Sequence, residues 1–101
     1  MERAVAYYQR AGEQAAARSA HEEAVAHLRM AVTVLDRAAE ANHDGWEAGL
    51  QRALALSLTA VRGYAHPETE ATYERARVLY SAIGDRENSS WALRGLANVC
   101  I

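Results

Sequence analysis

Apolar residues recur at three- and four-residue steps along almost the whole chain, a spacing that places them on one face of an α-helix. Polar and turn-forming residues separate these periodic stretches. The pattern therefore predicts five helices in series, at about residues 3–18, 19–40, 45–62, 67–84 and 88–101. Alanine, the best helix former, is abundant and phenylalanine is absent. The expected fold class is all-α, with a thin core between closely spaced helices.

Three of the predicted helices begin at recognisable start signals. Ser19 and Glu22 form the pattern S-x-x-E, a capping box in which the two side chains bond to free amides of the first turn. Asp44 and Glu47 repeat this pattern as D-x-x-E. Pro67, the only proline, suits the first position of a helix, where its missing N–H costs nothing.

The predicted helix ends are marked by glycine. Gly63 and Gly84 each follow a periodic stretch, where a left-handed residue commonly ends a helix. His66 is a candidate cap for the helix that begins at Pro67, and residues 85–89 are predicted to form a turn. The last helix is expected to end in apolar residues without a cap, which predicts a longer parent protein or pairing with a second copy.

Small and large apolar residues occupy fixed offsets in the first two predicted helices. With Tyr8 as the first aromatic position, Gly12 falls where two helices cross too closely for a side chain. Ala24, Leu28 and Ala31 then form the small–large–small series of the second helix. These offsets resemble the tetratricopeptide repeat, a helix–turn–helix unit that stacks into solenoids. The resemblance implies a surface that holds another polypeptide.

The same offsets recur, with insertions, in the later helices. The third, fourth and fifth helices place the corresponding residues at Ala53, Leu56, Ser57 and Ala60, then Thr69, Tyr73 and Ala76, then Leu93, Leu96, Ala97 and Cys100. We therefore predict one domain over residues 1–101, a right-handed solenoid fragment of antiparallel helices. Its repeats span about 3–40 and 45–84, followed by the first helix of a third repeat at 88–101. The alternative is an ordinary bundle of unrelated helices.

Three stretches resemble segments of particular bacterial proteins. Residues 4–31 and the pattern G-Y-A-x-P-E-x-E-x-x-Y-x-R-A-R-x-L at residues 63–79 are similar to the C-terminal repeat array of signalling proteins that join an adenylate/guanylate cyclase-like domain to an ATPase module. Residues 89–100 are closer to the repeats of ATP-dependent transcription activators. The resemblance implies a protein–protein or intramolecular scaffold in such a parent. No cyclase or ATPase motif lies in this chain, so neither activity is implied for it.

Composition excludes several functions. The net charge of −2 gives no reason to expect nucleic acid or a membrane surface as a partner. The chain has no lysine, which excludes a P-loop and a Schiff base. No apolar stretch is long enough to span a bilayer, and no secretion signal opens the chain. Cys100 is the single cysteine, so a reducing compartment, the cytoplasm, is expected.

No group of residues predicts catalysis, a cofactor or a metal. His21 and His27 are six residues apart, whereas two histidines that share a metal on one helix are three or four apart. Cys100 lies on the apolar side of the last helix, with no histidine or acid placed to activate it. An enzyme would need a convergent acid, base or metal cluster, and none is evident. We therefore expect the chain not to be an enzyme.

Partner binding is the better expectation, and it concerns the first helix of each pair, which lines the concave groove of such solenoids. The groove-facing positions of the repeat frame are Gln9, Glu13, Leu54, Leu58, Arg94 and Asn98. Arg94 and Asn98 on the last helix could bind a carboxylate. Leu54 and Leu58 could bind an apolar helix. Three occupants stay open: a protein or peptide, the continuation of the chain itself, and a small ligand in a pocket that includes Arg62. Self-association through the last helix is a further expectation.

Overall fold

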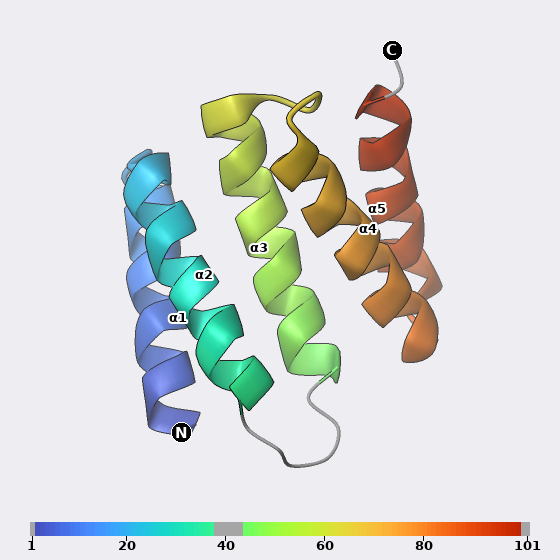
Figure 1. Ribbon diagram of the computed structural model, residues 1–101. Helices are drawn as coiled ribbons and strands as arrows, with labels where there is room; N and C mark the ends of the chain where they lie inside the picture. Colours follow the sequence, from blue (N-terminus) through green and yellow to red (C-terminus); the bar gives the residue numbers. More distant parts are fainter. Residues whose placement is uncertain (1, 38–43, 100–101) are drawn as a thin grey trace.

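The computed structural model describes residues 2–37 and 44–99, and these form five helices (Figure 1). They are α1 (Glu2–Ala17), α2 (His21–Arg37), α3 (Asp44–Arg62), α4 (Pro67–Ala82) and α5 (Arg86–Val99). The described residues contain no strand, which confirms the all-α prediction. The expectations for Cys100, for the apolar chain end and for the end of the second helix near residue 40 fall outside the described residues.

The helices pack mainly on their neighbours in sequence, α1 on α2, α2 on α3, α3 on α4 and α4 on α5. Figure 1 shows α2 and α4 in front, α1 and α5 behind them, and α3 between. A smaller contact joins α1 to α3. The two outer helices, α1 and α5, therefore each pack mainly on one neighbour, whereas α3 has packed neighbours on two sides.

The core is divided into two clusters that meet at α3. The first joins α1, α2 and α3 around the fully buried Leu28, Leu50 and Leu58. The second joins α3, α4 and α5 around Tyr80 and Ala92. Because α3 contributes to both clusters, its sequence is apolar on more than one side, as a helix buried between neighbours requires.

Gly12 lies where α1 crosses α2, as predicted from the sequence. A Cβ atom at this position would be 2.6 Å from Cγ of Leu28, well inside contact distance. Ala24, Leu28 and Ala31 on α2 are all completely buried, with 0% of each residue exposed. The small residues therefore allow the two helix backbones to approach closely, and the prediction for this helix pair is confirmed.

Gly95 makes a second close crossing, between α4 and α5, which the sequence pattern did not predict. A Cβ atom there would lie 2.3 Å from Cε1 of Tyr73. The Tyr73 ring is fixed on its other sides, since its centroid lies 5.2 Å from that of Trp91 and 6.0 Å from that of Tyr64. Its hydroxyl is also within hydrogen-bond distance, 3.2 Å, of the Thr59 hydroxyl.

Several local signals are confirmed. Gly63 and Gly84 have φ angles of 80° and 77°, so both take the left-handed conformation expected just after a helix. Pro67 is the first residue of α4. The Nδ1 atom of His66 accepts a hydrogen bond from the backbone N–H of Glu68 at 3.1 Å, which confirms His66 as the cap of α4.

The capping box predicted at Ser19 and Glu22 is wrong, because Ser19 ends α1 instead of starting α2. Its φ angle of 62° is left-handed, and its N–H donates to the carbonyl of Ala16 at 2.9 Å. The next N–H, of Ala20, donates to the carbonyl of Ala15 at 2.8 Å. This pair of bonds is a Schellman motif, which satisfies the last carbonyls of α1.

The predicted turn at residues 85–89 is shorter in the structure, because α5 begins at Arg86. Asp85 acts as its cap: Oδ1 accepts a hydrogen bond from the backbone N–H of Asn88 at 3.1 Å, and Oδ2 one from the Asn88 side chain at 2.8 Å. These bonds lower the pKa of the Asp85 carboxyl. The first turn of α5 therefore includes residues assigned to the turn by sequence.

Candidate binding surfaces

The predicted groove residues on α1 differ in what they contact. Gln9 is half-buried, and its Oε1 accepts a hydrogen bond of 2.7 Å from Nε1 of Trp46 on α3. Its Nε2 donates to the carboxylate of Glu13, which is exposed, at 3.2 Å. Gln9 therefore joins two helices of the chain, and Glu13 is the α1 residue more open to a partner.

Leu54 and Leu58 were predicted to line the groove, and the structure contradicts this. Only 5% of Leu54 and 0% of Leu58 is exposed, because both belong to the core cluster of α1, α2 and α3. Leu56, which the repeat frame also singled out on this helix, is 51% exposed. Two residues along a helix correspond to a rotation of about 200°, so Leu56 lies almost opposite the buried leucines.

The exposed side of α3 carries a different set of residues from the one predicted. Gly49, Arg52, Leu56 and Ala60 recur at three- and four-residue steps and are all exposed. We call these four residues the α3 stripe. The Arg52 guanidinium lies 4.9 Å from the centre of the Trp91 ring on α5, a cation–π contact that links the stripe to α5.

The remaining predicted groove residues lie on α5. Arg94 is exposed, and the side chain of Asn98 lies outside the described part of the structure. The structure therefore leaves Glu13 and Arg94 as exposed groove candidates on the two outer helices, with the α3 stripe on the helix between them. It does not bring Leu54 or Leu58 to any shared binding surface with these residues.

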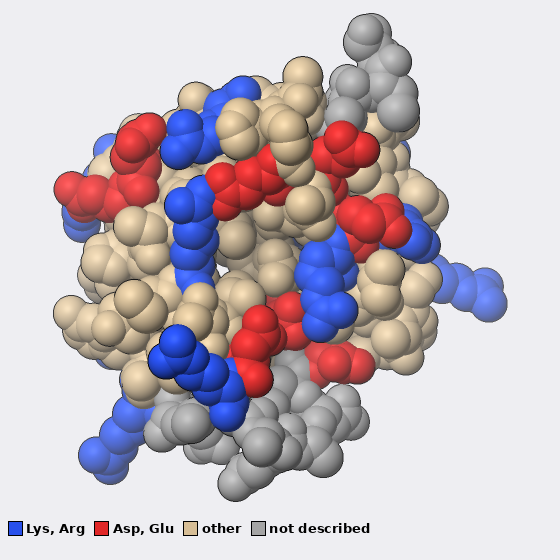
Figure 2. All heavy atoms as spheres, viewed as in Figure 1, with Lys and Arg blue, Asp and Glu red and all other residues tan. Residues whose placement is uncertain are grey.

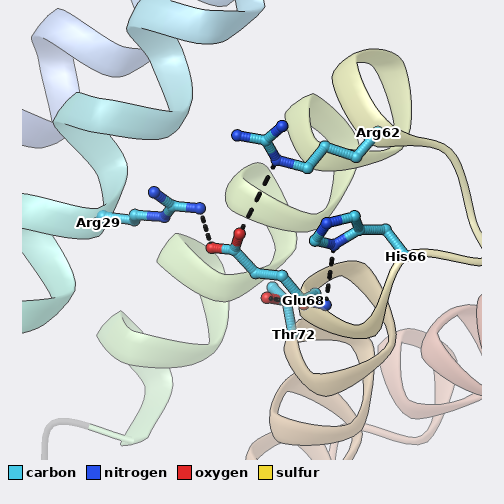
Figure 3. Close-up of polar contacts among 5 residues, drawn as sticks. All are labelled: Arg29, Arg62, His66, Glu68 and Thr72. Atoms are coloured by element: carbon cyan, nitrogen blue, oxygen red, sulfur yellow. Dashed lines mark hydrogen bonds and ion pairs between the residues drawn. The ribbon is translucent and has the colours of Figure 1, made fainter.

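A second candidate surface is centred on Glu68, in the first turn of α4. The Nη2 atom of Arg29, from α2, contacts Oε2 of Glu68, and Nε of Arg62, at the end of α3, lies 4.0 Å from Oε1 (Figure 3). We call these three residues the Glu68 cluster. It brings together side chains from α2, α3 and α4 around one carboxylate.

The start of α4 holds the Glu68 backbone in place. His66 caps its N–H, as described above, and the Thr72 hydroxyl donates to its carbonyl at 2.8 Å. The carboxylate also lies near the N-terminus of α4, where the helix dipole favours negative charge. These backbone bonds do not involve the carboxylate, so the first turn of α4 keeps its structure if that carboxylate moves.

A pocket of about 200 Å³ adjoins the two arginines of the Glu68 cluster. Its lining residues are Glu22, Val25, Ala26, Arg29, Val61 and Arg62. Two valines and an alanine thus contribute to its lining, together with Glu22 and the two arginines. No short sequence motif identifies this pocket, because its walls come from α2 and α3, far apart in the chain.

Another ion pair joins α3 to α4 on this surface. Nε and Nη2 of Arg75 donate to the two carboxylate oxygens of Glu47 at 2.9 and 3.0 Å, and Nε2 of Gln51 donates to Oε2 at 3.2 Å. Glu47 thus contacts another helix through its carboxylate, in place of the capping box predicted with Asp44. Figure 2 shows acidic and basic groups alternating around a hollow on this face.

The environment shifts two pKa values in opposite directions. Burial of Glu47 opposes its charged form, but hydrogen bonds from Arg75 and Gln51 and the charge of Arg75 outweigh burial and lower its pKa. Desolvation of Asp36, followed by repulsion from Glu47, raises the pKa of Asp36. Glu47 therefore stays ionised to a lower pH than an isolated glutamate.

This ion pair makes stability depend on pH. Because the folded pKa of Glu47 lies below the ordinary 4.5, its contribution is present at neutral pH and is lost as pH falls below 4.5 through the folded value. We expect Glu47→Gln to lower the free energy of unfolding by about 1–2 kcal/mol at neutral pH, as for a hydrogen bond to a charged group. The difference from the unmodified chain should shrink as pH falls through the folded pKa of Glu47, because the carboxyl then becomes protonated. Urea unfolding followed by circular dichroism measures both values.

Glu74→Gln is the matched control for this change. Glu74 pairs with Arg77 on the same exposed side of α4, and such surface pairs contribute about 0–1 kcal/mol. We expect the control to lower stability by less than about 0.5 kcal/mol at neutral pH. Equal losses for the two variants, or a loss at Glu47 that is independent of pH, would contradict the assignment.

His21 on α2 contacts a residue of α3. Nδ1 of His21 lies 3.3 Å from the Ser57 hydroxyl on α3. No group of three histidine, cysteine or acidic residues that could hold a metal occurs among residues 2–37 and 44–99. Within the same ranges, no helix is both long enough and apolar enough for a membrane span.

A comparison with protein-family models, curated proteins and solved structures found no match to this chain.

Proposed function

We propose that this chain is a tetratricopeptide-like, non-catalytic module that binds a protein or peptide, as part of a regulatory protein. The observation that carries the proposal is the packing order, in which each helix packs mainly on the next one in sequence. Repeat proteins have this arrangement, and the surface of the stacked helices is what they use for binding.

The burial of equivalent positions supports a repeat. Thr69, Tyr73 and Ala76 on α4 are 0%, 2% and 0% exposed, which matches the complete burial of Ala24, Leu28 and Ala31 on α2. In both helices the large member of the series also faces a glycine of a neighbouring helix. The resemblance of residues 4–31 and 63–79 to segments of bacterial signalling proteins favours a scaffold role in a protein of that kind.

The α3 stripe is the proposed contact surface, since it lies on the helix that separates the two outer ones. Leu56 provides an exposed apolar anchor there, next to small residues that let a partner backbone approach. A few well-packed side chains near the centre of an interface typically carry most of its binding energy. The stripe thus offers a place for a peptide side chain or for an apolar helix.

The test is a selection of displayed random peptides on the immobilised chain, followed by measurement of Kd by fluorescence anisotropy. Leu56→Glu should weaken binding of the selected peptides by about tenfold, the loss of one apolar anchor. Met30→Glu is the matched control, because Met30 is 45% exposed but lies on α2, away from the stripe. The control should change Kd by less than about twofold.

Two results would overturn the proposed surface. One is that no selected peptide binds the folded chain specifically. The other is that Leu56→Glu and Met30→Glu change Kd equally, which would mean that the peptides respond to general surface charge. Circular dichroism of both variants checks that each retains its helices.

A further inference from the structure

The Glu68 cluster has the composition of an anion-binding site that is filled by a side chain of the protein itself. Arg29 and Arg62 approach one carboxylate from two different helices (Figure 3). Guanidinium groups bind carboxylates through charge-assisted hydrogen bonds, and they keep their charge at any physiological pH. A carboxylate from a ligand could make the same contacts as the carboxylate of Glu68.

A ligand can replace the contacts of the Glu68 carboxylate at a small cost in free energy. The side chains of Arg29, Arg62 and Glu68 are 44%, 39% and 33% exposed. Ion pairs at such exposure contribute about 0–1 kcal/mol, because water and salt screen them. The Glu68 side chain can rotate away while its backbone stays capped by His66 and bonded to Thr72.

The adjoining pocket indicates which anions would fit. Val25, Ala26 and Val61 make part of its lining apolar, and its volume of about 200 Å³ is below the roughly 300–1,000 Å³ of pockets for drug-sized ligands. Glu22, its acidic lining residue, is exposed to solvent. The combination fits a small molecule with one anionic group and an apolar body.

We propose that this pocket binds a small organic carboxylate whose anionic group replaces that of Glu68 between Arg29 and Arg62, with its apolar body against Val25 and Val61. The site lies on the surface formed by α2, α3 and α4 and does not include the α3 stripe. The proposal is therefore independent of the proposed peptide-binding function. The ion pair between Glu68 and Arg29 links α4 to α2. Because the ligand would replace Glu68 in this pair, its binding would also break this contact between the two helices.

Benzoate and inorganic phosphate are the probes, titrated at low salt and followed by NMR chemical-shift changes of the backbone amides. Benzoate has both a carboxylate and an apolar ring, whereas phosphate has only the charge. We expect benzoate to bind more tightly than phosphate, with the largest shift changes at Val25, Ala26 and Val61. Stronger binding of phosphate would overturn the assigned ligand class.

The decisive variant is Glu68→Gln, which removes the competing charge but keeps the size of the side chain. It should tighten benzoate binding by about threefold, since the ligand no longer displaces an ion pair. Arg29→Gln and Arg62→Gln should each weaken it by about tenfold, the loss of one charge-assisted contact. A purely structural role for the cluster predicts no gain of affinity from any of these changes.

Glu74→Gln and Arg77→Gln are matched controls, because they alter an exposed ion pair elsewhere on α4. Each should change the benzoate Kd by less than about twofold. The proposal fails if Glu68→Gln binds benzoate no more tightly than the unmodified chain, or if the controls have the same effects as the cluster variants. Circular dichroism spectra of all variants establish that they are folded before the titrations are compared.

Discussion

Replacing Tyr73 with alanine should lower the free energy of unfolding by about 4 kcal/mol, as expected for the removal of a buried aromatic ring. Tyr73 is the largest fully buried side chain of the described residues, with 2% of its surface exposed. Its ring contacts Tyr64, Trp91 and Gly95, so its removal leaves a cavity between α4 and α5. Domains of this size are stable by about 5–15 kcal/mol, so the loss is a large part of the total.

Urea unfolding followed by circular dichroism measures this effect, with Tyr7→Ala as the control. Tyr7 is 65% exposed on α1, and exposed substitutions of this kind change stability by about 0.5 kcal/mol or less. Tyr73→Phe separates the ring from its hydroxyl, and should cost only about 1 kcal/mol for the contact with Thr59. A similar loss for Tyr73→Ala and Tyr7→Ala would contradict the placement of Tyr73 in the core.

Helix positions could be predicted from the sequence because their signals are local. Pro67, His66 and Gly63 act through residues within one turn of themselves, so the pattern around each was sufficient. Ser19 shows the limit of such signals. The same S-x-x-E pattern fits a helix start, but here the serine closes the preceding helix with a left-handed φ angle of 62°.

The orientation of α3 could not be predicted, for a physical reason. A helix with a single apolar stripe shows which side faces the core, whereas α3 packs on α2 and on α4 and has leucines on several sides. The repeat frame therefore assigned Leu54 and Leu58 to a groove. The structure buries both in the first cluster and leaves Leu56 exposed.

The Glu68 cluster depends on contacts between distant parts of the chain, which a pattern of neighbouring residues does not encode. Pro67 correctly predicted the helix start that puts Glu68 in the first turn, where negative charge is favourable. Its arginine partners are set by how α2 and α3 lie against α4. Glu47 shows the same competition, since its distant partner Arg75 replaces the local capping role that the sequence suggested.

The close helix crossing at Gly12 could be predicted from the sequence, whereas the crossing at Gly95 could not. Both lie within helices, where glycine costs about 1 kcal/mol relative to alanine, so each requires a reason in the fold. Gly12 was identified because its partner Leu28 follows at a known offset in the same helix pair. The partner of Gly95 is Tyr73, and the repeat frame assigned no contact between them.

Replacing Gly95 with alanine should therefore lower the free energy of unfolding by about 2 kcal/mol, although alanine is the better helix former. Overpacking a core costs about 1–3 kcal/mol. The cost here lies at the upper end of that range, because the new Cβ would be 2.3 Å from a ring held by Tyr64 and Trp91. The gain in helix propensity offsets about 1 kcal/mol of it.

Gly49→Ala is the matched control, since Gly49 lies within α3 and a Cβ there meets nothing within 4 Å. It should raise the free energy of unfolding by about 1 kcal/mol, the propensity gain alone. Urea unfolding of both variants measures the two effects, which are expected to have opposite signs. If Gly95→Ala stabilises the protein as Gly49→Ala does, α5 does not cross α4 at this residue.

Combining Gly95→Ala with Tyr73→Ala tests the contact itself. Once the ring is absent, the alanine Cβ has space, so Gly95→Ala should then stabilise the Tyr73→Ala protein by about 1 kcal/mol through helix propensity. The double-mutant cycle should therefore give an interaction energy of about 3 kcal/mol, at the upper end for residues in contact. An interaction energy near zero would show that the cost of the substitution at Gly95 does not arise from the Tyr73 ring.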